Sequence, residues 1–244
     1  MNAKQLTGEL VSWLQDRVNE AHCQGVVLGM SGGIDSSVLA VICQRAFPQS
    51  TLGVIMPCHS NPEDEEHARA VAGKFSISTR MVALDNAFDT LLQTLPDDLS
   101  DQTTARLAEA NLKARLRMLT LYYFANRLNY MVVGSGNRSE LAVGYFTKHG
   151  DSGVDVLPLG NLVKGEVREL ARFLGVPQVI IDKPPSAGLW VGQTDEAEMG
   201  FSYEELDRYI TTGDAAPELK KKLDAMIAAS AHKCQPPPYP DSPD

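Results

Sequence analysis

The stretch VVLGMSGGIDSSVLAVI at residues 26–42 decides the expected fold, because one turn joins two different kinds of apolar segment. The run at 26–30 is short and continuously apolar, as in a buried strand, and the segment at 36–46 has helical spacing. Glycines at the end of a strand let the backbone approach a ligand, and serines at a helix N-terminus add hydrogen-bond donors for an anion. The junction therefore predicts a phosphate-binding loop between a strand and a helix.

Outside this junction, short apolar runs alternate with helical patterns. An amphipathic helix precedes the first strand and ends before Gly25. The later elements that we expect are strands at 52–56, 80–84 and 130–133 and helices at 63–75, 103–128, 164–175 and 217–231. This alternation indicates a doubly wound parallel sheet flanked by helices, a Rossmann-like α/β fold.

The composition is that of a globular protein, with 244 residues of which 43% are hydrophobic and 22% charged. No internal repeat or Gly/Ser linker divides the chain, so we expect a single domain over residues 1–244. Residues 183–200 are rich in Pro, Gly and polar side chains without periodicity, which favours a mobile binding loop over a plain surface excursion. The proline-rich tail at 235–244 is expected to run extended over the surface.

The charge balance argues against several classes of partner. Lys and Arg number 22 and Asp and Glu number 31, so the formal net charge is −9 and binding to a nucleic-acid backbone is not expected. No apolar run reaches the roughly 18 residues of a membrane span, and the N-terminus lacks a signal-like core, so we expect a cytoplasmic protein without a membrane partner. The four cysteines form no C-x-x-C pair and are expected to be reduced thiols.

Residues 31–36, SGGIDS, lack the lysine that the G-x-x-x-x-G-K-[ST] loop of kinases and GTPases directs at the phosphates. The pattern S-G-G-x-D-S instead resembles the pyrophosphate loop of the ATP pyrophosphatase group, enzymes that cut ATP between its α- and β-phosphates and form an adenylated intermediate. An acid in a phosphate loop requires a cation between the two negative groups, so we expect Asp35 to bind Mg²⁺. The alternative is an ordinary Gly/Ser turn with a helix cap.

Four further stretches narrow this resemblance. They are NLKARLRM at 111–118, GSGNRSE at 134–140, GYFTKHGD at 144–151 and KPPSAGLW at 183–190, and His232 and Lys233 follow them. In this order they resemble the ammonia-dependent NAD synthetase family over most of the chain, which implies an adenine nucleotide alpha hydrolase-like fold. The resemblance also implies a reaction in two halves. The nicotinate carboxylate of deamido-NAD attacks ATP and releases pyrophosphate, and ammonia then displaces AMP to give NAD, the final step of NAD biosynthesis.

The same resemblance assigns roles to individual residues. Asp35 and Glu140 would bind Mg²⁺ and would carry catalysis together with Lys164. The residues expected to contact ATP are Gly29, Met30, Ser31, Gly32, Gly33, Ile34, Asp35, Ser36, Ser135, Lys164 and Ser186. The residues expected to contact deamido-NAD are Arg115, Lys148, Asp155, His232 and Lys233. Ser135 stands where the family usually has threonine, and it still offers a hydroxyl to ATP.

Each of these residues also has a simpler interpretation. Arg115 lies in a long charged helix where solvated pairing is the default, Glu140 alone is an ordinary solvated acid, and His232 with Lys233 suits a helix end. Lys164 is less ordinary, because a cation at the N-terminus of helix 164–175 opposes the helix dipole and favours an anion nearby. Trp190 is either a packing anchor or part of a lid, and we expect 183–200 to close over ATP.

Two other functions remain open on the sequence. One is a different ATP pyrophosphatase that amidates a nucleotide base or thiolates tRNA, although the net charge and the lack of a cysteine pair disfavour the tRNA enzyme. The other is a regulatory module that binds ATP without turnover, which would have little use for two magnesium ligands.

The nitrogen donor and the oligomeric state follow from the resemblance and the size of the chain. A glutamine-dependent enzyme needs a second domain with a catalytic cysteine, so free ammonia is the expected donor. In this family the dinucleotide lies across a homodimer interface lined by long helices, and the candidate here is helix 103–128. Its apolar positions include Leu112, Leu116, Leu119, Tyr122 and Tyr123. The alternative is that this stripe faces its own core.

Overall fold

The computed structural model of the chain describes residues 2–96, 101–186, 188 and 192–240. Within them, a parallel sheet has the strand order β3-β2-β1-β4. The strands are β1 (Gly25–Gly29), β2 (Thr51–Ile55), β3 (Ser78–Met81) and β4 (Tyr130–Val132). The chain first adds strands on one side of β1 and then crosses to its other side. In open α/β sheets a ligand binds beyond the carboxyl ends of the strands at such a reversal.

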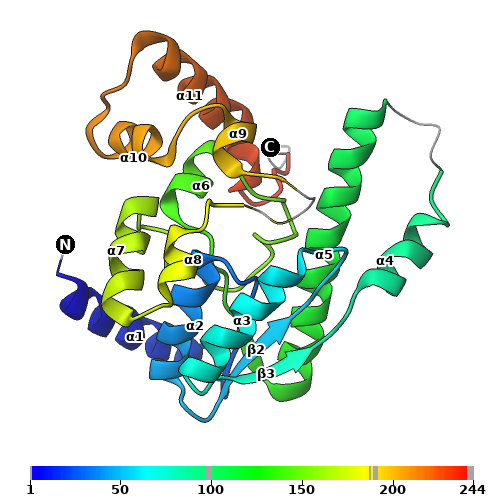
Figure 1. Cartoon of the computed structure of the whole chain (residues 1–244), viewed down its shortest axis with the longest axis vertical. Coiled ribbons are helices and arrows are strands. Elements are labelled where there is room, and N and C mark those ends of the chain that lie inside the picture. Colours follow the sequence, from blue (N-terminus) through cyan, green and yellow to red (C-terminus); the bar gives the residue numbers. More distant parts are fainter. Residues whose placement is uncertain (1, 97–100, 187, 189–191, 241–244) are drawn as a thin grey trace.

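Helices cover both faces of the sheet (Figure 1), as the doubly wound prediction requires. Alternate residues of β1 show the two faces: Val26 and Leu28 belong to one apolar cluster, and Val27 belongs to another. The first cluster contains residues of α1 (Ala3–Glu20), α2 (Ile34–Ala46), α3 (Pro62–Lys74), α7 (Lys164–Leu174) and α8 (Gln178–Asp182). The second contains residues of α4 (Asp85–Leu92) and α5 (Gln102–Leu128).

A third apolar cluster joins the remaining helices. These are α6 (Arg138–Val143), α9 (Asp195–Met199), α10 (Tyr203–Thr212) and α11 (Pro217–Ser230), followed by a 3-10 turn at Ala231–Lys233. Val143, Met199, Tyr203, Leu206 and Leu223 form the buried centre of this cluster together with Phe201. In Figure 1 these helices lie at the top, on the side toward which the strands point. The group therefore stands over the edge of the sheet where a ligand is expected.

The α/β prediction is confirmed, and two element boundaries differ in ways that matter for the site. The helix expected from residue 36 begins at Ile34, because Gly33 takes the extended N-cap conformation, so Asp35 and Ser36 lie in the first helical turn. The third strand, expected at 80–84, is 78–81. It is an edge strand with mostly exposed side chains. Leu84, the apolar end of the expected strand, lies beyond β3 and packs in the second apolar cluster.

The aperiodic segment at 183–200 is not entirely irregular, because α9 lies within it. Four further helices, α4, α6, α8 and α10, were not expected from the sequence. No helix in the described parts of the chain is long and apolar enough to cross a membrane. The four cysteines are free thiols, as expected.

Candidate active site

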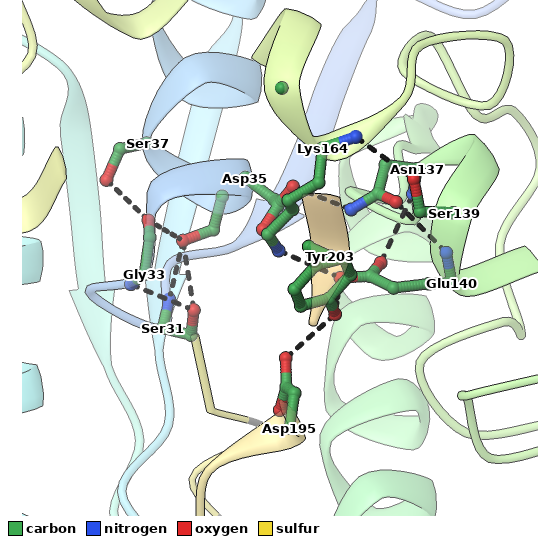
Figure 2. Close-up of polar contacts among 12 residues, drawn as sticks. Ser31, Gly33, Asp35, Ser37, Asn137, Ser139, Glu140, Lys164, Asp195 and Tyr203 are labelled. Carbon is green, nitrogen blue, oxygen red and sulfur yellow. Dashed lines mark hydrogen bonds and ion pairs between the residues drawn. The ribbon is translucent and has the colours of Figure 1, made fainter. Parts of the chain in front are cut away.

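The loop between β1 and α2 is held in shape by its own serines. Ser31 Oγ lies 3.0 Å from Ser36 Oγ and accepts a hydrogen bond from the Gly33 amide at 3.3 Å. The Ser37 hydroxyl donates to the Gly33 carbonyl at 2.7 Å, as Figure 2 shows. No side chain caps the N-terminus of α2, so its first amides remain directed at the space beyond the loop. This arrangement provides an anion site at a helix N-terminus.

Gly32 is required by this loop on two independent grounds. Its φ of +79° lies in the left-handed region, and a Cβ at this position would lie 2.1 Å from the Asp64 carbonyl oxygen. The absence of a side chain therefore lets the loop pack directly against the first turns of α3. Gly32 supports the shape of the loop and does not itself line the cleft described next.

A cleft of about 1200 Å³ opens at the carboxyl ends of the strands. It brings together most of the residues expected to contact ATP: Gly29, Met30, Ser31, Gly33, Ile34, Asp35, Ser36, Ser135, Lys164 and Ser186. Glu140 and Lys233 line the same cleft. The volume is that of a site for a large ligand, since pockets for drug-sized molecules measure roughly 300–1,000 Å³.

Lys164 is the centre of a buried polar cluster in this cleft, which consists of Asp35, Asn137, Glu140, Lys164, Asp195 and Tyr203 (Figure 2). The Lys164 side chain is 2% exposed, and its Nζ lies 2.5 Å from Asp35 Oδ2 and 3.1 Å from Glu140 Oε1. Asn137 donates to the other Asp35 oxygen at 2.9 Å. The anion expected near this lysine is therefore present as two carboxylates from α2 and α6. One ammonium group links acids that are distant in the sequence.

The backbone around Lys164 fixes its position. The Lys164 amide donates to Ser139 Oγ at 3.0 Å, and the Gly165 amide donates to Asp207 Oδ2 at 2.7 Å. Asn137 and Glu140 form a capping box at the start of α6, in which each side chain bonds the backbone of the other. The pattern N-x-x-E at 137–140 is a sequence signal for this helix start, and it would have predicted α6.

Burial controls the protonation of the cluster. It raises the pKa of Glu140 to about 7, with the Lys164 charge opposing this rise and the Asp35 charge adding to it. Burial alone would lower the pKa of Lys164, but the charges of Asp35 and Glu140 outweigh it and raise that pKa above its ordinary value. The carboxylates of Asp35 and Glu140 thus share the ammonium group of Lys164, and the cluster contains more acidic groups than cations.

Asp195 and Tyr203 belong to this cluster, although no role was expected for either residue from the sequence. The Tyr203 hydroxyl donates to Asp195 Oδ2 at 2.9 Å and lies 3.5 Å from Glu140 Oε1. The Tyr203 ring lies 4.8 Å from Lys164 Nζ, within the range of a cation–π contact. Neither residue falls in a motif quoted above, so only the three-dimensional structure identifies them.

Four of the five residues expected to contact deamido-NAD form a second group, here called the basic rim: Arg115, Lys148, His232 and Lys233. Arg115 donates to the Lys148 carbonyl at 3.3 Å, and Lys148 Nζ donates to the His232 carbonyl at 3.0 Å. Lys233 Nζ donates to the carbonyls of Gly144 and Phe146 at 2.8 and 3.1 Å. Among the described residues, none of the three cations has an ion-pair partner.

The fifth of these residues, Asp155, has different surroundings. Its carboxylate accepts hydrogen bonds from the Val132 amide at 2.8 Å and from the Tyr122 hydroxyl at 2.9 Å. It makes no hydrogen bond or ion pair with the basic rim among the described residues, and it does not line the cleft, which of these five residues only Lys233 does. These contacts tie it to the end of β4.

The start of the 183–200 segment lines the cleft and is joined to α3. Lys183 Nζ lies 2.5 Å from Asp64 Oδ1, and the Ser186 hydroxyl accepts a hydrogen bond from the Gly188 amide at 3.1 Å. Ser186 is exposed on the cleft side. Trp190, expected either to pack locally or to close a lid, lies outside the described residues.

Comparison with known proteins gives consistent results. A family model described as NAD synthase matches residues 6–237. The NH3-dependent NAD+ synthetase of Carboxydothermus hydrogenoformans is 50% identical over 240 residues, 98% of each chain. Among solved structures, the NMN synthetase of Francisella tularensis matches with a TM-score of 0.92 at 34% identity, covering 99% of this chain and 100% of that one. The NH3-dependent NAD synthetase of Campylobacter jejuni matches with a TM-score of 0.83 at 27% identity and the same coverage.

Proposed function

The chain belongs to the NAD synthase family and is an ATP-dependent ligase that makes NAD from deamido-NAD and ammonia, and we propose that the cleft around Lys164 is its active site. One observation carries this assignment: the phosphate loop, the pair Asp35 and Glu140, and Lys164 meet in one cleft at the strand reversal. We further propose that residues 1–244 act as one catalytic unit.

The first half of the reaction needs two polyanions held close together. The amides at the start of α2 and the hydroxyls of Ser31 and Ser36 suit the β- and γ-phosphates of ATP. Lys164 is suited to the charge that develops on the α-phosphate as the nicotinate carboxylate attacks it. The protein supplies no nucleophile, because the substrate carboxylate attacks first and ammonia second. Catalysis here consists of orientation and charge stabilisation.

The donor set suits Mg²⁺, which we propose as the metal held by Asp35 and Glu140. Within the described residues no group of three His, Cys, Asp or Glu side chains forms a cation cage. This agrees with Mg²⁺, which commonly takes one or two carboxylates and completes its shell with water and phosphate oxygens. Bound there, it would neutralise phosphate charge. The acid excess around Lys164 is the feature that fits a divalent cation.

The basic rim is the proposed site for deamido-NAD. Arg115, Lys148 and Lys233 are cations bonded to carbonyl oxygens, and none of them forms an ion pair with an acid among the described residues. A dinucleotide pyrophosphate is the anion that this rim suits. We also propose that Ser186 contacts ATP and that the segment beginning at Lys183 closes over the nucleotide.

A homodimer is the proposed assembly, with α5 in the interface. Leu107, Leu119 and Tyr123 on this helix are 52%, 59% and 57% exposed, whereas Leu121 packs inward at 8%. One side of α5 therefore packs in the core, and the other side leaves apolar side chains exposed. A cytoplasmic location is proposed from the composition. A monomeric mass in solution with full activity would refute the dimer.

A second candidate substrate is favoured by the match to the Francisella tularensis NMN synthetase. The corresponding reaction would amidate the deamidated mononucleotide, which lacks the adenylate half of the dinucleotide. The basic rim favours the dinucleotide over the mononucleotide, because the dinucleotide has an additional phosphate whose negative charge the cations of the rim can bind.

The direct test is product formation by the purified chain. It is supplied with ATP, Mg²⁺ and either deamido-NAD or nicotinic acid mononucleotide, in the presence of ammonium, glutamine or neither. The assignment predicts NAD with ammonium alone and a higher kcat/KM for the dinucleotide. Pyrophosphate release only with other acids would indicate a different ATP pyrophosphatase. ATP binding without any pyrophosphate release would indicate a regulatory module.

A further inference from the structure

Asp195 carries an unexplained buried acceptor. The residue begins α9 and is 4% exposed, yet it is an acid. Its Oδ2 accepts the Tyr203 hydroxyl hydrogen bond at 2.9 Å, but its Oδ1 has no hydrogen-bond partner among the described residues. A buried acceptor without a donor costs about 1–3 kcal/mol, and more when it is charged. Such an oxygen indicates a donor that arrives with a ligand.

The position of Asp195 connects it to the reaction. It lines the same cleft as the phosphate loop, and Figure 2 shows it below Tyr203, whose hydroxyl lies between Asp195 and Glu140. Its amide donates to the Pro185 carbonyl at 3.0 Å, which ties it to the segment that contains Ser186. Asp195 therefore lies between the proposed magnesium ligands and the segment proposed to cover ATP.

The charges around Asp195 select a cation. Asp35, Glu140 and Asp195 share one buried cation, Lys164, whose ammonium group already donates to the first two acids. Burial raises the pKa of Asp195, while Lys164, Tyr203 and Tyr145 oppose that rise. The Tyr145 hydroxyl donates to Glu198 at 2.8 Å, so its only proton is already used. The cluster thus has more negative charge than its own donors neutralise.

A second magnesium ion fits this position poorly. Asp35 and Glu140 are assigned to the first ion, so the acid left in this cluster is Asp195, whose single unpartnered oxygen among the described residues is a poor start for the octahedral shell that Mg²⁺ requires. The reaction, however, consumes ammonia, which is largely ammonium at neutral pH. This ion is small, carries one positive charge and has only donors to offer.

We propose that Asp195 Oδ1 forms the subsite that binds the co-substrate as an ammonium ion, an inference that rests on the function proposed above. Tyr203 holds the other carboxylate oxygen and so fixes the direction of Oδ1. The ion gives one proton to the Asp195 carboxylate, and the freed lone pair forms the C–N bond with the adenylated nicotinate. The bond from the carbonyl carbon to the AMP oxygen breaks with its electron pair on AMP, and nitrogen releases a second proton to solvent.

The test uses Asp195→Asn, which keeps the shape and an acceptor for Tyr203 but removes the charge. The KM for ammonium is expected to rise at least about tenfold, since a hydrogen bond to a charged group contributes roughly 1.5–3 kcal/mol. The KM for ATP and for deamido-NAD stays near the wild-type value. Adenylation, measured as ATP–pyrophosphate exchange without ammonium, is expected to lose much less activity than amidation at low ammonium does. The matched control is Glu204→Gln, which removes one exposed acid from the first turn of α10.

Hydroxylamine provides a second readout, because it is a largely uncharged amine at neutral pH. The variant should form the hydroxamate from hydroxylamine nearly as fast as the wild type does, while it has lost its affinity for ammonium. An unchanged KM for ammonium would overturn the subsite, and so would an equal loss of adenylation and amidation, which indicates a structural role. If the wild-type protein makes no NAD at all, the proposed function has failed instead.

Discussion

The buried cluster around Lys164 lies in the cleft, and the basic rim reaches the cleft through Lys233; these two polar regions have opposite charge balances. In the buried cluster around Lys164, three carboxylates share one cation, and the side chains bond mainly to each other. In the basic rim, Arg115, Lys148 and Lys233 bond only to backbone carbonyls and have no acid within ion-pair distance among the described residues. A protein with a net charge of −9 thus keeps one cationic surface beside an acidic interior.

This difference indicates what each region binds. An acid excess in a buried position favours cations, and we assign Mg²⁺ and ammonium to it. A set of unneutralised cations at the rim favours an anion, and we assign the dinucleotide pyrophosphate to it. The buried cluster is held in shape by its own hydrogen bonds, whereas the described residues give the cations of the rim no ion-pair partner.

Removing Asp35 should give the largest effect. Asp35→Asn removes a proposed magnesium ligand and half of the ion pair that holds Lys164. We expect kcat/KM to fall by about 10³-fold, a loss typical of a group that stabilises transition-state charge. Steady-state NAD formation measures it. Asp16→Asn, at an exposed position on α1, is the control, and a comparable loss there would show that net charge alone is responsible.

Gly32→Ala tests whether the loop is held in shape before ligand binds. The added Cβ would meet the Asp64 carbonyl and strain a φ of +79°, so the loop must shift. A displacement of this kind costs about 10²-fold in kcat/KM. Gly73→Ala is the matched control, because it lies in α3 with open space around its Cβ and is expected to stabilise the protein slightly. Equal activities of the two variants would contradict a loop fixed by packing.

Substitutions in the basic rim should raise the KM for deamido-NAD without changing the rate at which bound deamido-NAD is adenylated. Arg115→Gln is expected to raise the KM for deamido-NAD about tenfold, equivalent to roughly 1.4 kcal/mol, with the KM for ATP nearly unchanged. Arg172→Gln, at an exposed position on α7, is the control. A rise in the KM for ATP in the Arg115 variant would place the ATP phosphates at the rim and reverse the assignment.

The smallest expected effect concerns stability without metal or nucleotide. The pKa of Glu140 is about 7 in the folded state against 4.5 ordinarily, so the folded protein holds this proton more tightly than the unfolded chain does. The free energy of unfolding therefore falls as pH rises from the lower to the higher of these values. Glu140→Gln removes the group that titrates, so the variant does not lose this part of its free energy of unfolding as pH rises. Its Tm should exceed that of the wild type by a few degrees at about pH 8 and by little at about pH 5. Thermal melting at both values measures it, and a constant difference would refute the assigned pKa.

The fold and part of the site follow from local patterns in the sequence. The strand before SGGIDS and the alternation of elements predict the sheet, and the switch from strand to helix puts Asp35 just before the expected helix, whereas α2 begins at Ile34 and already includes it. The position of Lys164 at a helix N-terminus predicts nearby anions, which are present. Each of these signals depends on neighbours within a few residues.

The rest of the site depends on contacts between distant segments. Asp195 lies in an aperiodic stretch, and its partner Tyr203 carries no motif, so no local pattern indicates that they meet Glu140. Besides the N-x-x-E pattern at 137–140, a second signal was present but unused: Ser202 and Glu205 form a capping box that marks the start of α10. It predicts the helix, but not the direction in which Tyr203 points.

The most direct test of the two charge regions is a crystal structure of the protein with Mg²⁺, deamido-NAD and an ATP analogue that has a methylene group between its α- and β-phosphorus atoms. We expect Mg²⁺ on Asp35 and Glu140, the analogue's phosphates at the start of α2, and the dinucleotide pyrophosphate beside Arg115, Lys148 and Lys233. A dinucleotide pyrophosphate on the loop at 31–36, with the ATP analogue at the basic rim, would contradict it.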